Sequence, residues 1–105
     1  MNVHININDK ELLKLYQTGS SKKLRLPETV IDKFFATIQK IESATSIHDF
    51  WKDSGLGFEK LRGFKNRYSM RLTAKYRLEM EIEWKNTENT IGEFILKEIS
   101  SHYGD

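Results

Sequence analysis

The sequence predicts an α+β domain in which a small, antiparallel-rich sheet is covered on one face by two or three helices. The chain before Gly57 shows mostly helical periodicity, with apolar residues three and four positions apart, and the chain after it alternates with a period of two. A length of 105 residues supports one hydrophobic core, so we expect a single domain over residues 1–105. Amphipathic helices and a half-wet sheet bury their apolar surfaces against each other, which favours this layered arrangement.

The chain begins with an expected strand and an expected helix. Apolar and polar residues alternate over positions 2–7, which predicts a half-buried strand. Asn8 or Asp9 fits the N-cap of the helix that follows, and Gly19 fits its end, because glycine adopts the left-handed conformation at little cost. A strand followed by a helix is therefore expected at this end of the chain.

Two more helices are expected before Gly57. Pro27 suits the first turn of the second helix. That helix has an apolar face formed by Val30, Phe34, Ile38 and Ile41. Ser46, followed three residues later by Asp49, has the form of a capping box for a short third helix that ends before Gly55.

Four strands are expected after Gly57, arranged as an antiparallel meander. The first two cover residues 58–62 and 67–73. The third, residues 77–85, alternates so regularly that one face should be apolar and the other exposed to water. The fourth, residues 90–99, is denser in apolar residues and suits a central strand.

Charge is distributed unevenly along the chain. Residues 51–77 contain eight Lys/Arg and two Asp/Glu, a net charge of +6, whereas residues 78–105 contain two and seven, a net charge of −5. A basic block inside a nearly neutral chain is typical of a face that meets a polyanion, although an ion-paired, solvated face has the same composition. By strand alternation, the sheet face away from the helices should carry Lys60, Arg62, Arg71 and Arg77.

Several classes of function are excluded by composition. The chain has no cysteine, which removes disulfides, thiolate zinc sites and thiol nucleophiles. Its three histidines are too scattered to indicate a metal site, and no glycine-rich phosphate loop is present. No apolar stretch approaches the roughly 18 residues that span a bilayer, and the first ten residues do not resemble a signal peptide. We therefore expect a soluble, cytoplasmic protein that needs no metal or cofactor.

Three segments resemble the HigB-type toxins of the RelE/ParE superfamily. They are Phe-Glu-Lys-Leu-Arg-Gly at 58–63, Tyr-Ser-Met-Arg-Leu at 68–72 and Lys-Tyr-Arg-Leu-Glu-Met-Glu at 75–81. In that family a Pro-Leu-Lys-Gly strand end precedes an aromatic-led strand and an Asn-Trp-Arg-type strand start. The resemblance covers roughly residues 28–103. It implies a small α+β fold, a ribosome-dependent endoribonuclease that cuts messenger RNA, and neutralisation by a cognate, HigA-like antitoxin.

The resemblance also implies the site residues. Arg62 stands where the family has the lysine of Leu-Lys-Gly, and Arg77 stands at the arginine of the third strand. Glu59 replaces a histidine of many relatives, so an imidazole at this position has no part here. The family often ends in Asp-Tyr-His, whereas here His102 precedes Tyr103, which leaves open which of the two takes which role. The expected catalytic residues are therefore Arg62, Arg77, His102 and Tyr103.

These residue types suit RNA cleavage without a metal, in which the 2′-hydroxyl of RNA attacks the adjacent phosphate. His102 has a side chain that titrates near neutral pH and can act as an acid or a base. Tyr103 can transfer a proton or stack on a base. The two catalytic arginines would stabilise the charge that develops on the phosphate. Contacts to the RNA backbone are expected from Lys60, Lys65, Arg67 and Arg71.

Other functions and roles remain open from the sequence. A non-enzymatic toxin of the ParE type that acts on gyrase, and an RNA-binding module without catalysis, fit the same fold. Arg77 could be a structural residue that pairs with Glu79 or Glu81, and Tyr103 could close the core at the edge of the sheet. Solvated surface positions are an equally good explanation for Lys65 and Arg67.

Overall fold

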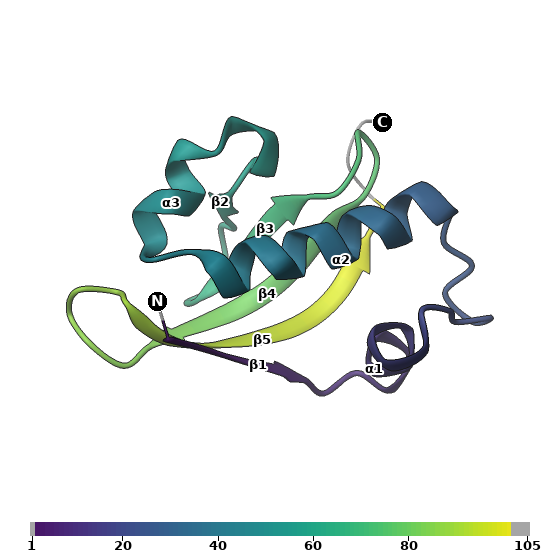
Figure 1. Cartoon of the computed structure of the whole chain (residues 1–105), viewed down its shortest axis with the longest axis horizontal. Helices are drawn as coiled ribbons and strands as arrows, with labels where there is room; N and C mark the ends of the chain where they lie inside the picture. Colours follow the sequence, from purple (N-terminus) through teal and green to yellow (C-terminus); the bar gives the residue numbers. More distant parts are fainter. Residues whose placement is uncertain (1, 102–105) are drawn as a thin grey trace.

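The computed structural model describes residues 2–101 and contains one five-stranded sheet with the helices packed against it (Figure 1). The elements are β1 (Asn2–Ile7), α1 (Lys10–Thr18), α2 (Glu28–Ser43), α3 (Ile47–Lys52), a 3₁₀ turn η1 (Ser54–Leu56), β2 (Glu59–Lys60), β3 (Arg67–Arg71), β4 (Arg77–Trp84) and β5 (Ile91–Ser100). The strand order is β1-β5-β4-β3-β2. The expected α+β class is confirmed.

Strands β2 to β5 form the expected antiparallel meander, and β1 adds a parallel pair to it. Strand β5 lies between β1 and β4, so both of its edges are paired, as its dense apolar sequence predicts. Strand β2 is shorter than the expected strand over residues 58–62. Two long strands therefore form the middle of the sheet, and a very short one forms the edge next to β3.

The ends of α1 follow from its sequence. The Asp9 side chain accepts a hydrogen bond from the backbone N–H of Leu12 at 3.2 Å, which identifies the N-cap left open between two residues. Gly19 ends the helix with a φ of 79°, a left-handed conformation that favours glycine. In α2, Pro27 is the N-cap residue just before the first turn rather than a member of it.

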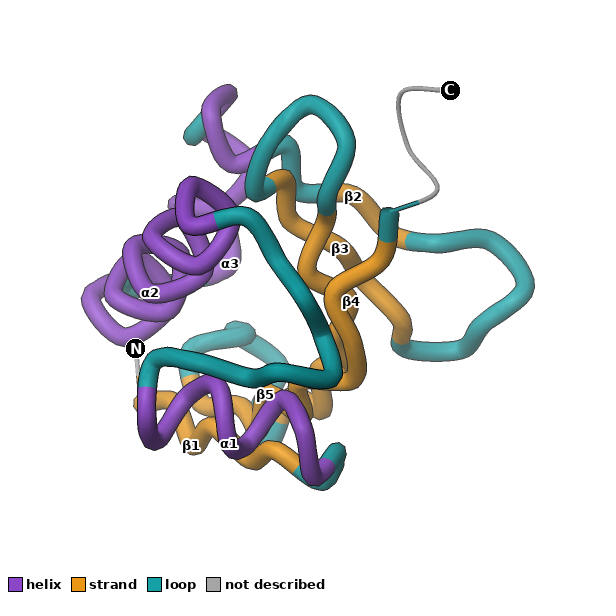
Figure 2. The backbone as a smooth tube through the Cα atoms, turned by 90° about the vertical axis from the view of Figure 1, so that its right-hand side faces the viewer, coloured by secondary structure: helices purple, strands orange, loops and turns teal. Residues whose placement is uncertain are grey.

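The hydrophobic core lies between the helices and one face of the sheet. All four apolar residues expected on the buried face of α2 are at most 3% exposed. Leu12 and Leu15 of α1 and Phe50 of α3 belong to the same core, and Figure 2 shows α2 and α3 on one side of the sheet. Burial of each such side chain contributes roughly 1.5–3 kcal/mol. No helix in residues 2–101 is long and apolar enough to cross a membrane.

The short helix α3 is held by a variant of the expected capping box. The Ser46 hydroxyl accepts from the N–H of His48 at 3.3 Å. The Asp49 carboxylate accepts from the N–H and the hydroxyl of Thr45, at 2.7 and 2.9 Å. These hydrogen bonds to the charged form, first of all the one from the Thr45 backbone, lower the pKa of Asp49 below its ordinary value.

A β-bulge in β5 decides which side chains leave the core. Glu79 pairs with Glu98, but the next residue, Met80, pairs with Leu96, so Lys97 is an extra residue. The shift returns Ile99 to the core side, opposite Leu78. Glu98 consequently lies on the same side of the sheet as Glu79, away from the helices.

Candidate functional site

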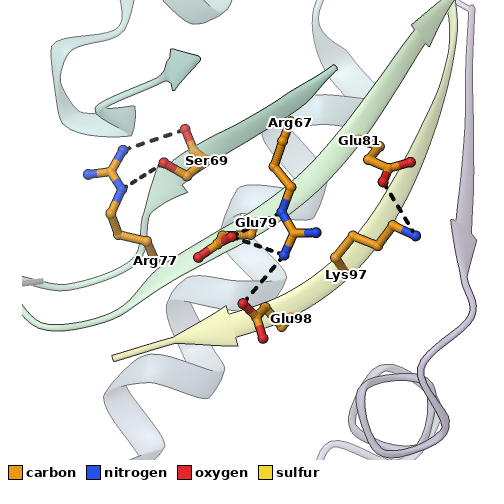
Figure 3. A network of polar contacts seen from close by, with 7 residues as sticks. All are labelled: Arg67, Ser69, Arg77, Glu79, Glu81, Lys97 and Glu98. Carbon is orange, nitrogen blue, oxygen red and sulfur yellow. Dashed lines mark hydrogen bonds and ion pairs between the residues drawn. The ribbon is translucent and has the colours of Figure 1, made fainter. Parts of the chain in front are cut away.

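The sheet face opposite α2 and α3, called the open face below, carries charges of both signs (Figure 3). It includes Arg67, Ser69, Arg71, Arg77, Glu79, Glu81, Lys97 and Glu98. The acidic residues come from β4, which pairs with the basic strand β3, and from β5, which pairs with the other edge of β4. The expected basic face is therefore a mixed one, because the two oppositely charged blocks of the sequence fold onto each other.

Arg67 is neutralised by carboxylates of its own chain. Its Nε and Nη2 each lie 3.0 Å from Glu79 Oε1, and Nη2 also lies 3.4 Å from Glu98 Oε1. The side chains of Arg67 and Glu79 are only 16% and 8% exposed. The expectation of a fully wet face on β4 is thus wrong at Glu79, because the Arg67 side chain of β3 lies against its carboxylate.

Arg77 is buried and ties an edge segment to the sheet. The residue is 6% exposed, its Nε donates to Ser69 Oγ at 2.9 Å, and its Nη2 donates to the carbonyl oxygen of Gly57. The Nε also lies 3.9 Å from Glu59 Oε1. Arg77 therefore fixes the chain between η1 and β2 relative to β3 and β4.

Arg71 pairs with Arg77 in the sheet but is exposed, and it makes no ion pair with any residue in the described range. Gly57, with a φ of 55°, lies under it: a Cβ on Gly57 would come within 3.1 Å of Arg71 Cβ. Glycine is therefore needed where Arg71 crosses the η1–β2 connection. Arg71 is the last residue of β3, and at this end of the sheet it also lines a cleft of about 230 Å³ with Lys33 and Lys40 of α2, so its surroundings are not confined to the open face.

The remaining basic candidates lie on or beside the loop between β2 and β3. Arg62 and Lys65 are exposed within this loop, so strand pairing does not assign Arg62 to either face. Lys60 pairs with Tyr68, whose ring belongs to the core side, while Glu59 pairs with Ser69. The expectation that Lys60 lies on the open face is wrong, because a one-residue difference in register reverses the side of a strand residue.

His102 and Tyr103 lie outside the described residues. The last strand ends at Ser100, which pairs with Arg77. Within residues 2–101 no group of three or more His, Cys, Asp or Glu side chains is arranged to hold a metal ion.

Sequence reasoning missed the partners that hold the arginines. The position of Ser69 could have been predicted, because alternation places Ser69 between Arg67 and Arg71 on one face of β3. The carbonyl of Gly57 carries no sequence signal. Glu98 was missed because its side depends on the bulge, which no residue type in β5 marks.

Comparisons with known proteins support the fold. No family model matches the chain, and no curated protein matches it. A solved YoeB/ParE toxin from Agrobacterium tumefaciens superimposes with a TM-score of 0.54 at 15% identity, over 98% of this chain and 100% of the toxin. A YoeB dimer from Staphylococcus aureus gives a TM-score of 0.50 at 13% identity, over all of both chains. The chain thus has the fold of YoeB/ParE toxins.

Proposed function

We propose that the protein is the toxin of a type II toxin-antitoxin system and acts as a HigB-type, ribosome-dependent endoribonuclease on messenger RNA. The fold shared with YoeB/ParE toxins over nearly the whole chain supports a toxin. The observation that carries the enzymatic proposal is the pair at the end of β3 and the start of β4, where the exposed Arg71 lies beside the buried Arg77. Such a pair offers one cation to a ligand and uses the other to keep the site rigid.

The roles of the two arginines follow from their exposure. Arg71 is exposed and forms no ion pair within the described residues, so its guanidinium is available to form two hydrogen bonds to a phosphate. Arg77 is already bonded to Ser69 and Gly57, so we assign it to positioning the site rather than to direct phosphate contact. Arg62 remains a proposed phosphate ligand on the β2–β3 loop, with Lys65 as a further contact to the RNA backbone.

The proposed reaction needs no cofactor. The 2′-oxygen of RNA attacks the adjacent phosphorus, its proton passes to a base, and the bond from phosphorus to the 5′-oxygen breaks as an acid protonates that oxygen. The products are a 2′,3′-cyclic phosphate and a 5′-hydroxyl. We assign the acid and base roles to His102 and Tyr103, which follow Ser100 in the sequence by two and three residues.

A cognate, HigA-like antitoxin and the translating ribosome are the proposed partners. An acidic segment of an antitoxin could cover Arg71 and the cations of the β2–β3 loop, which would block RNA without changing the toxin. The ribosome would supply the messenger RNA in an extended, single-stranded form.

A reconstituted translation reaction tests the proposed function. Primer extension on the translated message should show cuts within codons for the wild-type protein, and these cuts should be lost with Arg71→Ala and with His102→Ala. Lys23→Ala, which removes an exposed cation from the α1–α2 connection, is the matched control and should cut normally. All variants should keep the wild-type unfolding midpoint.

An intact message in the wild-type reaction would contradict the nuclease. If growth nevertheless stops when the protein is produced, the target is not RNA, and a ParE-type action on gyrase replaces the proposal. Cuts that persist in Arg71→Ala would contradict the assigned role of Arg71.

A further inference from the structure

The loop between β2 and β3 is a short, well-anchored projection on the open face. Its ends are fixed by two backbone hydrogen bonds, from Leu61 N–H to the Arg67 carbonyl at 2.8 Å and from Ile82 N–H to the Asn66 carbonyl at 3.1 Å. Gly63 turns the chain with a φ of 85°. Figure 2 shows this loop on the side of the sheet opposite the helices. Residues 62–65 are therefore presented to solvent from a rigid base.

Phe64 is the exposed aromatic residue of this loop, and the side chain of Arg67 packs against its ring. The Arg67 guanidinium carbon lies 5.1 Å from the centre of the ring, and Glu79 and Glu98 hold that guanidinium in place. Phe64 nevertheless keeps 54% of its surface exposed. A ring that contributes little to the core but is held by a clamped arginine is suited to stack on another flat group.

The charges around Phe64 indicate what that group is. Residues 60–67 contain four Lys/Arg and no Asp/Glu. Arg67 is neutralised by carboxylates, whereas Arg62 and Lys65, two residues before and one residue after Phe64, form no ion pair with any residue of 2–101. An apolar protein partner would strip water from these two cations without replacing it. A nucleic acid strand provides both a flat base and the phosphates that pair with them.

We propose that Phe64 is a stacking platform for a base of single-stranded RNA, with Arg62 and Lys65 bound to phosphates of the same strand. This inference rests on the proposed function for its choice of RNA. It adds a site for an unpaired base, read by shape and not by sequence, next to the cations that would hold the backbone.

Binding of a fluorescently labelled single-stranded RNA, measured by anisotropy over a series of KCl concentrations, tests the inference without requiring cleavage. Phe64→Ala and Phe64→Leu should each weaken binding roughly 5- to 150-fold, because a base loses its stacking partner. The dependence of log Kd on log salt should stay as in the wild type. Phe64→Trp should bind at least as tightly as wild type.

Two controls separate stacking from charge and from a general surface effect. Arg62→Ala should reduce the salt slope by about 0.7, as expected when one phosphate contact to a single strand is lost. Ile91→Ala removes an apolar side chain that is 43% exposed elsewhere on the sheet and should leave binding unchanged. Phe64→Leu keeps an apolar side chain of similar size, so its loss of binding cannot be assigned to a folding defect if its unfolding midpoint matches the wild type.

The inference is overturned if Phe64→Leu binds like the wild type, or if a fully base-paired RNA shows the same dependence on Phe64. Either result would assign the exposed ring to a protein partner or to the fold. If stacking holds but the wild type does not cut messages during translation, the nuclease proposal fails and this one stands. If cleavage occurs and Phe64→Leu binds normally, this inference alone fails.

Discussion

The middle of the open face and its edge contain the same kinds of cation, but the fold uses them in opposite ways. In the middle, Arg67 is partly buried against carboxylates, and Arg77 is buried against a hydroxyl and a backbone carbonyl. At the edge, Arg62, Lys65 and Arg71 are exposed and form no ion pair within the described chain. The difference shows that a basic stretch of sequence becomes a binding surface only where strand pairing does not supply the opposite charge.

The largest expected effect on stability comes from Arg77. Arg77→Ala should lower the free energy of unfolding by about 3 kcal/mol, because Ser69 Oγ and the Gly57 carbonyl lose a buried, charged donor. Arg71→Ala, at the directly paired position of the neighbouring strand, is the control and should cost less than about 0.5 kcal/mol. Urea unfolding of the two variants checks this, and equal losses would contradict the division of roles.

A smaller effect is expected for the pair in the middle of the face. Arg67→Met should cost about 2 kcal/mol, because it leaves the Glu79 carboxylate buried without its partner. The double variant Arg67→Met/Glu79→Met should be more stable than the sum of the two single changes predicts.

Glu81 and Lys97 form a more exposed ion pair on the same face, which serves as the control for the Arg67–Glu79 pair. Glu81→Gln breaks the 3.6 Å contact to Lys97, whose side chain is about a third exposed, and should cost less than about 0.5 kcal/mol. If the effects of Arg67→Met and Glu79→Met on the free energy of unfolding are additive, the Arg67–Glu79 pair is no stronger than the Lys97–Glu81 pair, which would contradict the expected difference.

The smallest effect concerns a carboxylate outside both regions, Asp49. Its pKa in the folded state is lowered from 3.8 by the Thr45 hydrogen bonds. The stability this carboxylate contributes is therefore fully present above its unfolded-state pKa and is lost as the pH falls through the lower folded-state value. Asp49→Asn should be less stable than the wild type near neutral pH, and the gap should close in acid. A gap that does not narrow as the pH falls below the unfolded-state pKa would contradict this assignment.

Local elements were predictable from the sequence because their signals are local. The Gly19 stop of α1 and the apolar face of α2 follow from single residues and from spacing within one helix. Strand register was not predictable, because it depends on which residues of distant segments meet. For this reason Lys60 lies on the opposite side of the sheet from the one expected, and the bulge at Lys97 places Glu98 on the open face.

The candidate site was predictable only as a list of cations. Arg71 and Arg77 share a face by alternation, but nothing in the sequence states that one is exposed and the other is bonded to a backbone carbonyl. Burial of this kind is a property of the assembled sheet. The proposed role of Phe64 was equally unpredictable, because the sequence alone does not distinguish an exposed phenylalanine between cations from a core residue.

Hydrogen exchange at the arginine Nε–H groups, followed by NMR in the free protein and with single-stranded RNA, distinguishes the arginines held by the fold from those free to bind RNA. We expect slow exchange for Arg67 and Arg77 in both states, since each Nε–H donates to a buried acceptor. We expect fast exchange for Arg62 and Arg71 in the free protein, and slower exchange for both when RNA is bound. Fast exchange of Arg67 or Arg77 in the free protein, or no change at Arg62 and Arg71 with RNA, would contradict this distinction.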